Sequence, residues 1–410
     1  MRSFRWIIAI SVIFVAYVDM PMANGQYPSY SDAIKRMERI EEDGGSDISL
    51  NVLKINGSAV WTEDRDGILK NIHILEISKG GEAQILVIAN LHARECVAAV
   101  SALKLGEYLS LYLKDDESKK KVKEEWGKDS RFAYFRQFKE MKAENMLEVA
   151  TIRIVPIANP DGYYYVRPET DGGQRWRKNR RDNENDPEPQ SHGNSDNTQF
   201  TGVDLNRNFP SLNSGEEAQQ PDGTWVVSRW KLSDLYCGRP KSGQWSLAGP
   251  QELIQEREVS GIVEIAKQVN ISCLIDLHSY AGSVGWVERP LLSHGLRPNG
   301  GFTDQSVFSF LGAKSAALIK DPGGQYYIPE ITPYIDEGTI TATTGDSLAW
   351  IYEKKNCLAF LIEIGKSVQL PSNPDKHADA ILPGMLFMMF CAVDNSFSAK
   401  PVLKFKKPKQ

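Results

Sequence analysis

The sequence predicts an α/β fold in which a largely parallel sheet lies between layers of helices. Apolar runs of strand length alternate with segments of helical period: a strand over 83–90 precedes a helix over 97–113, and a helix over 251–269 leads into the apolar strand 271–278. Strands separated by helices are typical of parallel sheets that are covered on both faces. With 410 residues, the chain is long enough for one large domain of this kind or two smaller ones.

The remaining segments extend the same alternation. The other predicted elements are helices over 30–41, 302–319 and 375–393 and strands over 50–55, 71–78, 151–159 and 357–365. The last helix is expected to kink or begin at Pro383. We expect solvated helices over the charged stretch 114–148, a turn at 160–162, and loops that rim a cleft over 184–199 and 213–223.

The strand over 83–90 runs directly into His92-Ala93-Arg94-Glu95, and this arrangement suggests a metal site. Residues three apart lie on one face of a helical turn, so the imidazole of His92 and the carboxylate of Glu95 can converge on one cation. A second His-x-x-Glu match, His73 to Glu76, lies inside a predicted strand, where the two side chains point to opposite faces. We interpret this second match as a chance recurrence of a short pattern.

A catalytic zinc site uses three protein ligands and keeps a fourth position open, so a third ligand has to come from elsewhere in the chain. Of the six histidines, His278 is the best placed, because it ends a second apolar strand. Ligands collect at the carboxyl ends of strands in open α/β sheets. The alternative for His278 is a buried histidine whose hydrogen bonds are satisfied. His192, His294 and His377 are expected to be solvated surface residues.

Residues 1–25 have the pattern of a secretory signal, with a basic start, an apolar run over 7–18 and small residues before the expected cleavage after Gly25. No later stretch reaches transmembrane length, so we expect a secreted protein without stable membrane insertion. Asn56-Gly57-Ser58 and Asn270-Ile271-Ser272 are glycosylation sequons, which in a eukaryotic secretory pathway predict a glycoprotein.

Charge and cysteine content exclude two broad classes of protein. The net charge is −5 and basic residues are interspersed with acids, which argues against a nucleic-acid surface. We expect the basic end 400–410 to be a flexible, solvated tail, with contact to an anionic surface as the alternative. Five cysteines are too few for a disulfide scaffold and lack metal-binding spacing. Cys96, Cys273 and Cys357 are expected to behave as small free hydrophobes.

Three charged residues stand out among the later motifs. Glu363 lies inside the apolar strand CLAFLIEIG, where an unpaired charge is costly, so it should be at the strand end, paired or catalytic. Arg177 follows the Asn159-Pro160-Asp161-Gly162 segment, and Arg207 lies in TGVDLNRNFP. Either arginine taken alone is more simply explained as a partner in a surface salt bridge.

Taken together, these motifs resemble the zinc carboxypeptidase family of the A/B type over nearly all of the chain after residue 25. The resemblance rests on the order and spacing of HARE (92–95), NPDGY (159–163), RWRKNR (175–180), GVDLNRNFP, LAGPQELIQERE, DLHSY (276–280), TGDSLAW (344–350) and the strand of Glu363. GVDLNRNFP is also similar to the corresponding motif in the regulatory N/E branch of the same family, but DLHSY favours the A/B branch.

The resemblance implies one catalytic domain over 26–399, built on a mixed, largely parallel eight-stranded sheet with helices on both faces. It implies a metallocarboxypeptidase with one Zn²⁺ per chain, bound by His92, Glu95 and His278. Glu363 would be the general base that activates the zinc-bound water, and Arg177 would stabilise the oxyanion. We expect a monomer that acts on the C-termini of peptides or proteins.

The same resemblance assigns residues to substrate binding. Asn206 and Arg207 would hold the terminal carboxylate of the substrate, which an arginine fork matches with two hydrogen bonds. Arg94, Ser279 and Tyr280 match positions that line the outer subsites.

One position departs from the family pattern. The family has a mobile tyrosine that caps the bound substrate, and the matching position here is Thr341; the nearest tyrosine is Tyr334. Catalysis is still expected, with weakened or altered capping.

The specificity pocket is predicted to be apolar. Its key position matches Leu348, accompanied by Ile340, Thr343 and Leu361, which favours aliphatic or aromatic C-terminal residues. Asp336 and Asp346 leave a basic-residue preference open, because an acid inside the pocket would favour Lys or Arg.

Two other classes of function are kept as alternatives. A non-catalytic binder of peptide C-termini would suit the missing tyrosine, although a binder does not need the metal ligands, the base and Arg177 together. An amidohydrolase acting on acylated amino acids would use the same zinc and base.

Overall fold

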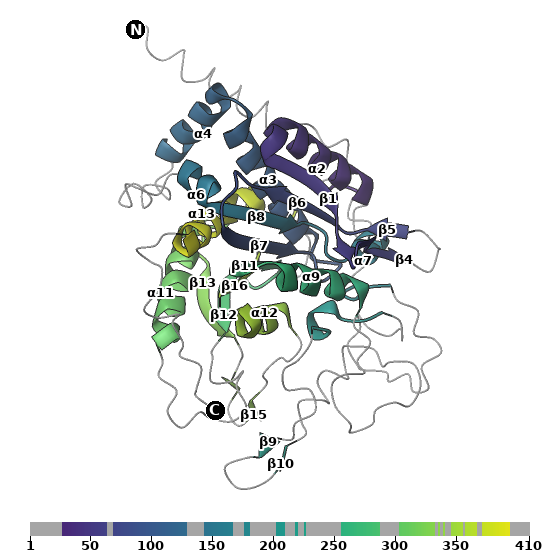
Figure 1. The fold of residues 1–410 in the computed structure, drawn as a ribbon. Coiled ribbons are helices and arrows are strands. Elements are labelled where there is room, and N and C mark those ends of the chain that lie inside the picture. The colour runs from purple at the N-terminus through teal and green to yellow at the C-terminus, as the bar shows by residue number, and fades with distance from the viewer. Residues whose placement is uncertain are drawn as a thin grey trace.

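The structure is a computed structural model (Figure 1). It describes residues 27–63, 69–128, 143–166, 176–180, 202–209, 218–219, 225–226, 256–287, 303–332, 335–336, 339–340, 346–355, 357–366 and 371–393. Several expectations fall outside the described residues: the signal segment 1–25, the tail 400–410, His192, His294, Tyr334, Thr341 and Thr343. The loop predicted over 184–199 lies outside as well.

An eight-stranded mixed sheet forms the centre of the fold. Its strands are β1 (Ile48–Val52), β6 (His73–Ile77), β7 (Ala83–Ala89), β8 (Ala150–Val155), β11 (Ile271–His278), β12 (Ser283–Val287), β13 (Ile328–Thr332) and β16 (Leu358–Glu363). The strand order is β1-β6-β8-β7-β11-β16-β12-β13. The four central strands β8, β7, β11 and β16 are parallel, as are β12 and β13, whereas the other three pairs are antiparallel. The predicted α/β class with a mixed, largely parallel sheet is confirmed.

Short two-stranded ribbons lie outside this sheet. They pair β2 (Lys54–Ile55) with β3 (Ser58–Ala59), β4 (Trp61–Glu63) with β5 (Leu69–Asn71), β9 (Ala218–Gln219) with β10 (Trp225–Val226), and β14 (Ile335–Asp336) with β15 (Thr339–Ile340). Both predicted sequons are exposed at Asn56 and Asn270. Glycosylation at either site stays a prediction.

The helices match most of the predicted segments. They are α2 (Tyr30–Gly44), α3 (Cys96–Lys114), α4 (Asp116–Lys128), α6 (Ala143–Val149), α7 (Pro160–Val166), α9 (Arg257–Gln268), α11 (Thr303–Leu318), α12 (Ser347–Lys355) and α13 (Pro374–Val393), with 3-10 turns η1 (Gly45–Asp47) and η2 (Leu205–Arg207). Pro383 lies inside α13, which is one continuous element from Pro374.

The turn predicted at 160–162 was wrong, because Pro160 begins the helix α7. Proline is well suited to the first helical position, where its missing N–H leaves no hydrogen bond unmade. The side chain of Asn159 caps this helix, since its Oδ1 accepts from Gly162 N at 3.0 Å. The expectation for His377 was also wrong: it lies in the first turns of α13 and is half-buried.

Different helices pack on the two faces of the sheet. Helices α3 and α13 pack against each other and against β11, and α12 packs against β11 and β16 (Figure 1). Ser347, the first residue of α12, contacts Asp276, which lies on the same face of β11 as His278. The predicted site residues at the strand ends therefore lie on the face covered by α12.

The expectation that no stretch after the signal segment reaches transmembrane length was wrong, because helices α3 and α13 are long and apolar enough to cross a membrane by length and composition alone. Most of each is buried inside the fold, 78% and 72% of the two most apolar windows, so both are core helices. Cys96, Cys273, Cys357 and Cys391 are buried, which agrees with the small hydrophobes predicted at the first three positions.

Candidate metal and catalytic site

A tight turn between β7 and α3 brings His92 and Glu95 together. Asn90, which follows β7, has a left-handed backbone with φ 57°, a conformation that asparagine tolerates better than most residues. Its amide Nδ2 donates to the carbonyls of His92 and Ala93 at 3.1 and 3.2 Å. Glu95 N donates to His92 O at 3.0 Å and closes the turn. The predicted i, i+3 convergence is therefore produced by one hydrogen-bonded turn.

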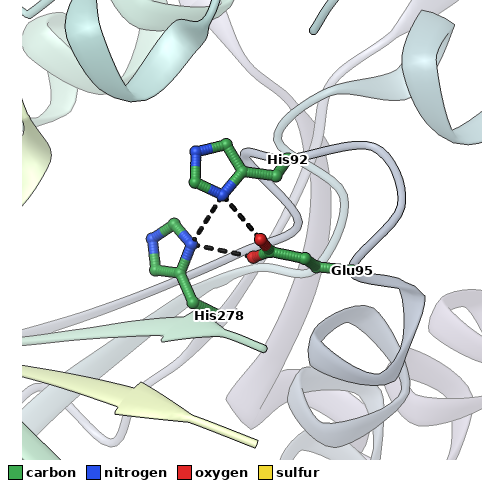
Figure 2. A group of neighbouring side chains, drawn as sticks. All are labelled: His92, Glu95 and His278. Atoms are coloured by element: carbon green, nitrogen blue, oxygen red, sulfur yellow. Dashed lines mark hydrogen bonds and ion pairs between the residues drawn. The ribbon is translucent and has the colours of Figure 1, made fainter. Parts of the chain in front are cut away.

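His278 reaches the same point because β11 lies beside β7 in parallel register. Ala89 pairs with Leu277, so the carboxyl ends of the two strands meet, and His278 is the last residue of β11. Figure 2 shows the three side chains converging: His92 Nδ1 lies 2.8 Å from Glu95 Oε1, and His278 Nδ1 lies 3.1 Å from His92 Nδ1 and 2.9 Å from Glu95 Oε2. All three residues are buried.

The size and donor set of this cluster fit a zinc ion. Adjacent ligands of a tetrahedral zinc with bonds of about 2.0–2.1 Å lie roughly 3.3 Å apart, close to the separations of 2.8–3.1 Å measured here. Two imidazole nitrogens and a carboxylate are common zinc ligands. Among the described residues, this is the one group of three His, Cys, Asp or Glu side chains close enough to share an ion.

The far side of each imidazole ring faces a carboxylate. His278 Nε2 lies 3.1 Å from Asp276 Oδ2, and His92 Nε2 lies 3.3 Å from Asp204 Oδ1. Carboxylates in this position favour a proton on Nε2 and leave the Nδ1 lone pair for a metal. The ring orientations thus agree with two Nδ1 ligands.

The buried charges support a cation in the cluster. Burial alone would raise the pKa of Glu95, but His92 and His278 outweigh it and lower that pKa, so the carboxylate stays ionised. Burial alone would lower the pKa of His278, whereas the carboxylates of Asp276 and Glu95 raise it well above the ordinary value. The cluster therefore attracts positive charge, which protons supply when no metal is bound.

Glu363 lies beside the cluster without belonging to it. It ends β16 and pairs in register with His278 on the neighbouring parallel strand, so both side chains lie on the same face of the sheet. Burial, reinforced by Glu95, raises the pKa of Glu363 to about 7 against the opposing effects of His278 and Arg177. The expectation that this charge lies at a strand end is confirmed.

Arg177 is held against the same site by Asp204. Its Nε donates to Asp204 Oδ2 at 2.8 Å, and its Nη1 lies 4.0 Å from Glu95 Oε1. Burial would lower the pKa of Arg177, but Asp204 and Glu95 outweigh it and raise the pKa. A fixed guanidinium beside the cluster can stabilise negative charge that develops there.

Hydrogen bonds of Asn179 hold the segment that carries Arg177 in place. Its Oδ1 accepts from Val203 N at 2.7 Å, and its Nδ2 donates to Glu256 and Glu258 at 2.9 and 3.2 Å. Burial and the neighbouring Glu256 raise the pKa of Glu258 to about 8. One asparagine and two buried acids thereby join the segment 176–180, the segment 202–209 and the start of α9.

Some of the residues predicted for substrate binding contact the metal-binding cluster or lie next to it. Ser279 donates its backbone N–H to Glu95 Oε2 at 3.2 Å, and Arg94 lies within the turn between His92 and Glu95. Asn206 Nδ2 lies 3.3 Å from His278 Nε2, and its Oδ1 accepts from Ser347 N at 2.9 Å.

The other predicted substrate residues are less closely tied to the cluster. Tyr280 is partly exposed just beyond β11, and Leu348 is buried in the first turn of α12. Arg207 lies in η2, and its side chain is outside what the structure describes. The second His-x-x-Glu match lies inside β6, as predicted, with His73 and Glu76 both partly exposed.

Four supporting residues were not predicted from the sequence: Asn90, Asp204, Asp276 and Asn179. Asp276 could have been found, because it interrupts the apolar strand ISCLIDLH just as Glu363 interrupts its own strand. Asn90, Asp204 and Asn179 carry no comparable signal, since polar residues in loops are common.

The geometry agrees with comparisons to known proteins. The model of the family described as zinc carboxypeptidase matches residues 49–377. The chain therefore belongs to the zinc carboxypeptidase family, whose members use one zinc ion.

Two curated relatives carry related names. Carboxypeptidase A4 of Mus musculus is 24% identical over 299 residues, 72% of this chain and 54% of the relative. Metallocarboxypeptidase A-like protein of Trichophyton verrucosum (strain HKI 0517) is 25% identical over 340 residues, 82% of this chain and 62% of the relative. The chain thus spans less than two thirds of the length of either relative.

Solved structures show the same fold. Thrombin activatable fibrinolysis inhibitor has a TM-score of 0.58 at 18% identity, covering 90% of this chain and 75% of that one. Carboxypeptidase A from Helicoverpa armigera has a TM-score of 0.54 at 16% identity, covering 96% of this chain and 80% of that one.

Zinc should stabilise the folded protein through the three clustered side chains. At a zinc concentration 100 times its dissociation constant, binding adds about 2.7 kcal/mol to the free energy of unfolding. Thermal unfolding with zinc and with a chelator measures the difference. Glu95→Gln should abolish it, whereas His73→Gln, in the second His-x-x-Glu match, should leave it intact. An equal loss in both variants would contradict the assignment.

Glu258 should make stability fall as pH rises. The unfolded chain releases this proton near the ordinary value of 4.5, whereas the folded chain keeps it until about 8, so the free energy of unfolding declines between these values. Glu258→Gln should flatten the decline and be more stable than wild type at pH 7.5 by about 1–3 kcal/mol. Urea unfolding of the zinc-free protein measures this, with Glu264→Gln on the same helix as control. Parallel pH profiles for wild type and Glu258→Gln would refute the prediction.

Proposed function

We propose that this protein is a zinc-dependent carboxypeptidase that hydrolyses the last peptide bond of peptides and proteins. The observation that carries the proposal is the register pair of His278 with Glu363. It places a carboxylate that is not part of the metal-binding cluster immediately beside it. A site that only bound a metal would not need this additional, partly buried carboxylate.

The chemistry divides among four groups. Zinc, which His92, Glu95 and His278 would hold, would supply a Lewis acid for the scissile carbonyl and for the attacking water. Glu363 takes a proton from the attacking water and later delivers it to the leaving amine. A base with a raised pKa suits this work near neutral pH. Arg177, held by Asp204, stabilises the negative charge that develops on the carbonyl oxygen.

Binding of the terminal carboxylate restricts cleavage to the last bond. We assign this carboxylate to Asn206 and Arg207, since an amide and a guanidinium can both donate to it. Asn206 is buried between His278 and the start of α12, so a carboxylate beside it would be close to the metal cluster. Arg94, Ser279 and Tyr280 would contact residues further from the C-terminus of the substrate.

The pocket for the leaving side chain is proposed to be apolar. Leu348 in α12 is buried, and Leu361 in β16 lies on the same face of its strand as Glu363. Together they favour aliphatic or aromatic C-terminal residues. Asp346, buried just before α12, is the described acid that would instead favour Lys or Arg.

The proposed setting is extracellular. The signal pattern of residues 1–25 and the exposed sequons at Asn56 and Asn270 support a secreted glycoprotein. We propose that the domain 26–399 acts as a monomer on peptide C-termini, without nucleic-acid partners, and that residues 400–410 form a flexible tail.

The test is release of C-terminal residues from blocked dipeptides that end in Phe, Leu, Lys, Arg and Glu. We expect release of Phe and Leu that a chelator stops and zinc restores. Glu363→Gln should lower kcat/KM by about 10²–10⁴-fold, because it removes the general base, while zinc content stays at one per chain. Glu76→Gln, at a partly exposed position of β6, is the control and should keep full activity.

The remaining outcomes separate the alternatives. Preferential release of Lys and Arg would contradict the apolar specificity pocket and would indicate that Asp346 sets the preference. Tight binding of peptides without hydrolysis by the zinc-loaded protein would overturn the enzyme in favour of a binder of C-termini. Hydrolysis restricted to acylated amino acids would indicate an amidohydrolase.

A further inference from the structure

Asp276 occupies an unusual position for a carboxylate. It lies two residues before His278 on the same face of β11, and it is completely buried in the middle of the sheet. Oδ2 accepts a hydrogen bond from Ser347 Oγ and lies 3.1 Å from His278 Nε2. Its other oxygen, Oδ1, has no hydrogen-bond partner among the described residues.

Such an arrangement is costly unless positive charge compensates it. A buried charge that makes few hydrogen bonds loses much of its hydration free energy. One hydrogen bond from a serine hydroxyl does not compensate for that loss. His278 is the neighbour that can supply the compensation, either as a protonated ring or as a ring bound to a cation. The location of Asp276 is thus explained by the metal cluster rather than by the stability of the strand.

The contact also determines which nitrogen of His278 faces the metal position. Nε2 lies 3.1 Å from Asp276 Oδ2 and 3.3 Å from Asn206 Nδ2. A lone pair on Nε2 would be repelled by the nearer, charged oxygen, so the hydrogen belongs on Nε2. Nδ1, which faces Glu95 and His92 in Figure 2, then carries the lone pair.

Ser347 connects this contact to the substrate side of the site. Its hydroxyl donates to Asp276 and its backbone N–H donates to Asn206 Oδ1 at 2.9 Å. It is also the first residue of α12, and Leu348 follows it. If α12 shifts, the Ser347 hydroxyl that donates to Asp276 shifts with it. The position of α12 therefore affects the carboxylate that faces His278.

We propose that Asp276 is a positioning residue that orients His278 toward the metal and, through Ser347, ties the metal site to the helix carrying the specificity pocket. This inference rests on the zinc site of the proposed function and extends it to two residues that have no direct contact with the metal position. Ser347 and Asp276 act as one unit, because the hydroxyl holds the oxygen that faces the ring.

The test measures zinc retention rather than activity. Zinc-loaded full-length protein is mixed with a chromogenic chelator, and the rate of zinc loss is followed. Asp276→Asn keeps the size of the side chain but removes its charge, so we expect zinc affinity about 10–100-fold lower. Ser347→Ala leaves the carboxylate but frees it to rotate, and zinc loss should be about fivefold faster. The visible spectrum of the cobalt-substituted protein should shift in both variants.

Controls separate positioning from general stability. Thermal unfolding of the zinc-free proteins should show Asp276→Asn close to wild type, because the variant loses the pairing with a protonated His278 but no longer buries a charged carboxylate. Ser101→Ala, which removes a buried hydroxyl in α3 that donates to the backbone carbonyl of Val97, should leave zinc loss unchanged. KM for a Phe-ending substrate should rise in Ser347→Ala, because the helix bearing Leu348 loses its anchor.

Three results would overturn the inference. Unchanged zinc affinity and an unchanged cobalt spectrum in Asp276→Asn would show that the carboxylate does not orient His278. Equal destabilisation of zinc-free and zinc-loaded Asp276→Asn would show a purely structural role. If Asp276→Asn fails to fold, unchanged zinc loss in Ser347→Ala decides against the proposal. Absence of zinc binding in the wild type would instead contradict the proposed function itself.

Discussion

The parallel register of β11 with β7 and β16 determines the geometry of the whole site. It aligns Leu277 with Ala89 and His278 with Glu363, so one metal-ligand candidate, the turn after β7 and the proposed catalytic carboxylate meet at one edge of the sheet. Because the side chains of a strand alternate between faces, a slip of one residue would turn His278 away from Glu95 and Glu363. The apolar residues of these buried strands hold the register, and the chemistry depends on it.

A second constraint is the balance of charge at that edge. Glu95, Asp204, Asp276 and Glu363 bring four carboxylates together, and Arg177 is the described cation in contact with two of them. Buried carboxylates in such number repel one another unless positive charge lies between them. A divalent ion in the cluster restores most of the balance, which explains why so many acids are tolerated in the core.

Much of the site could be predicted from sequence because its residues interrupt strong patterns. His92 and Glu95 follow an apolar strand, His278 ends another, and Glu363 is a charge among aliphatic residues. The parallel sheet followed from the alternation of strands and helices, although α7 was mistaken for a turn because proline and glycine occur together at 160–162.

The supporting residues were harder to predict, since their roles depend on contacts between distant segments. Asn179 joins residues separated by 24 and 77–79 positions, and Ser347 contacts Asp276 across 71 positions. The helical and strand periodicities of the sequence do not indicate such long-range contacts. Asp276 itself was visible as a charge in a buried strand, yet only the orientation of the His278 ring gives it a role.

The most direct test of this account is X-ray absorption at the zinc edge of the purified, zinc-loaded protein, together with metal analysis. With one zinc per chain, we expect only nitrogen and oxygen ligands, at distances of about 2.0–2.2 Å, and the multiple-scattering features of two imidazoles. Sulfur at about 2.3 Å would place the ion on cysteine instead, and a single imidazole would exclude either His92 or His278. Either result would contradict the central claim that these two histidines and Glu95 hold the metal.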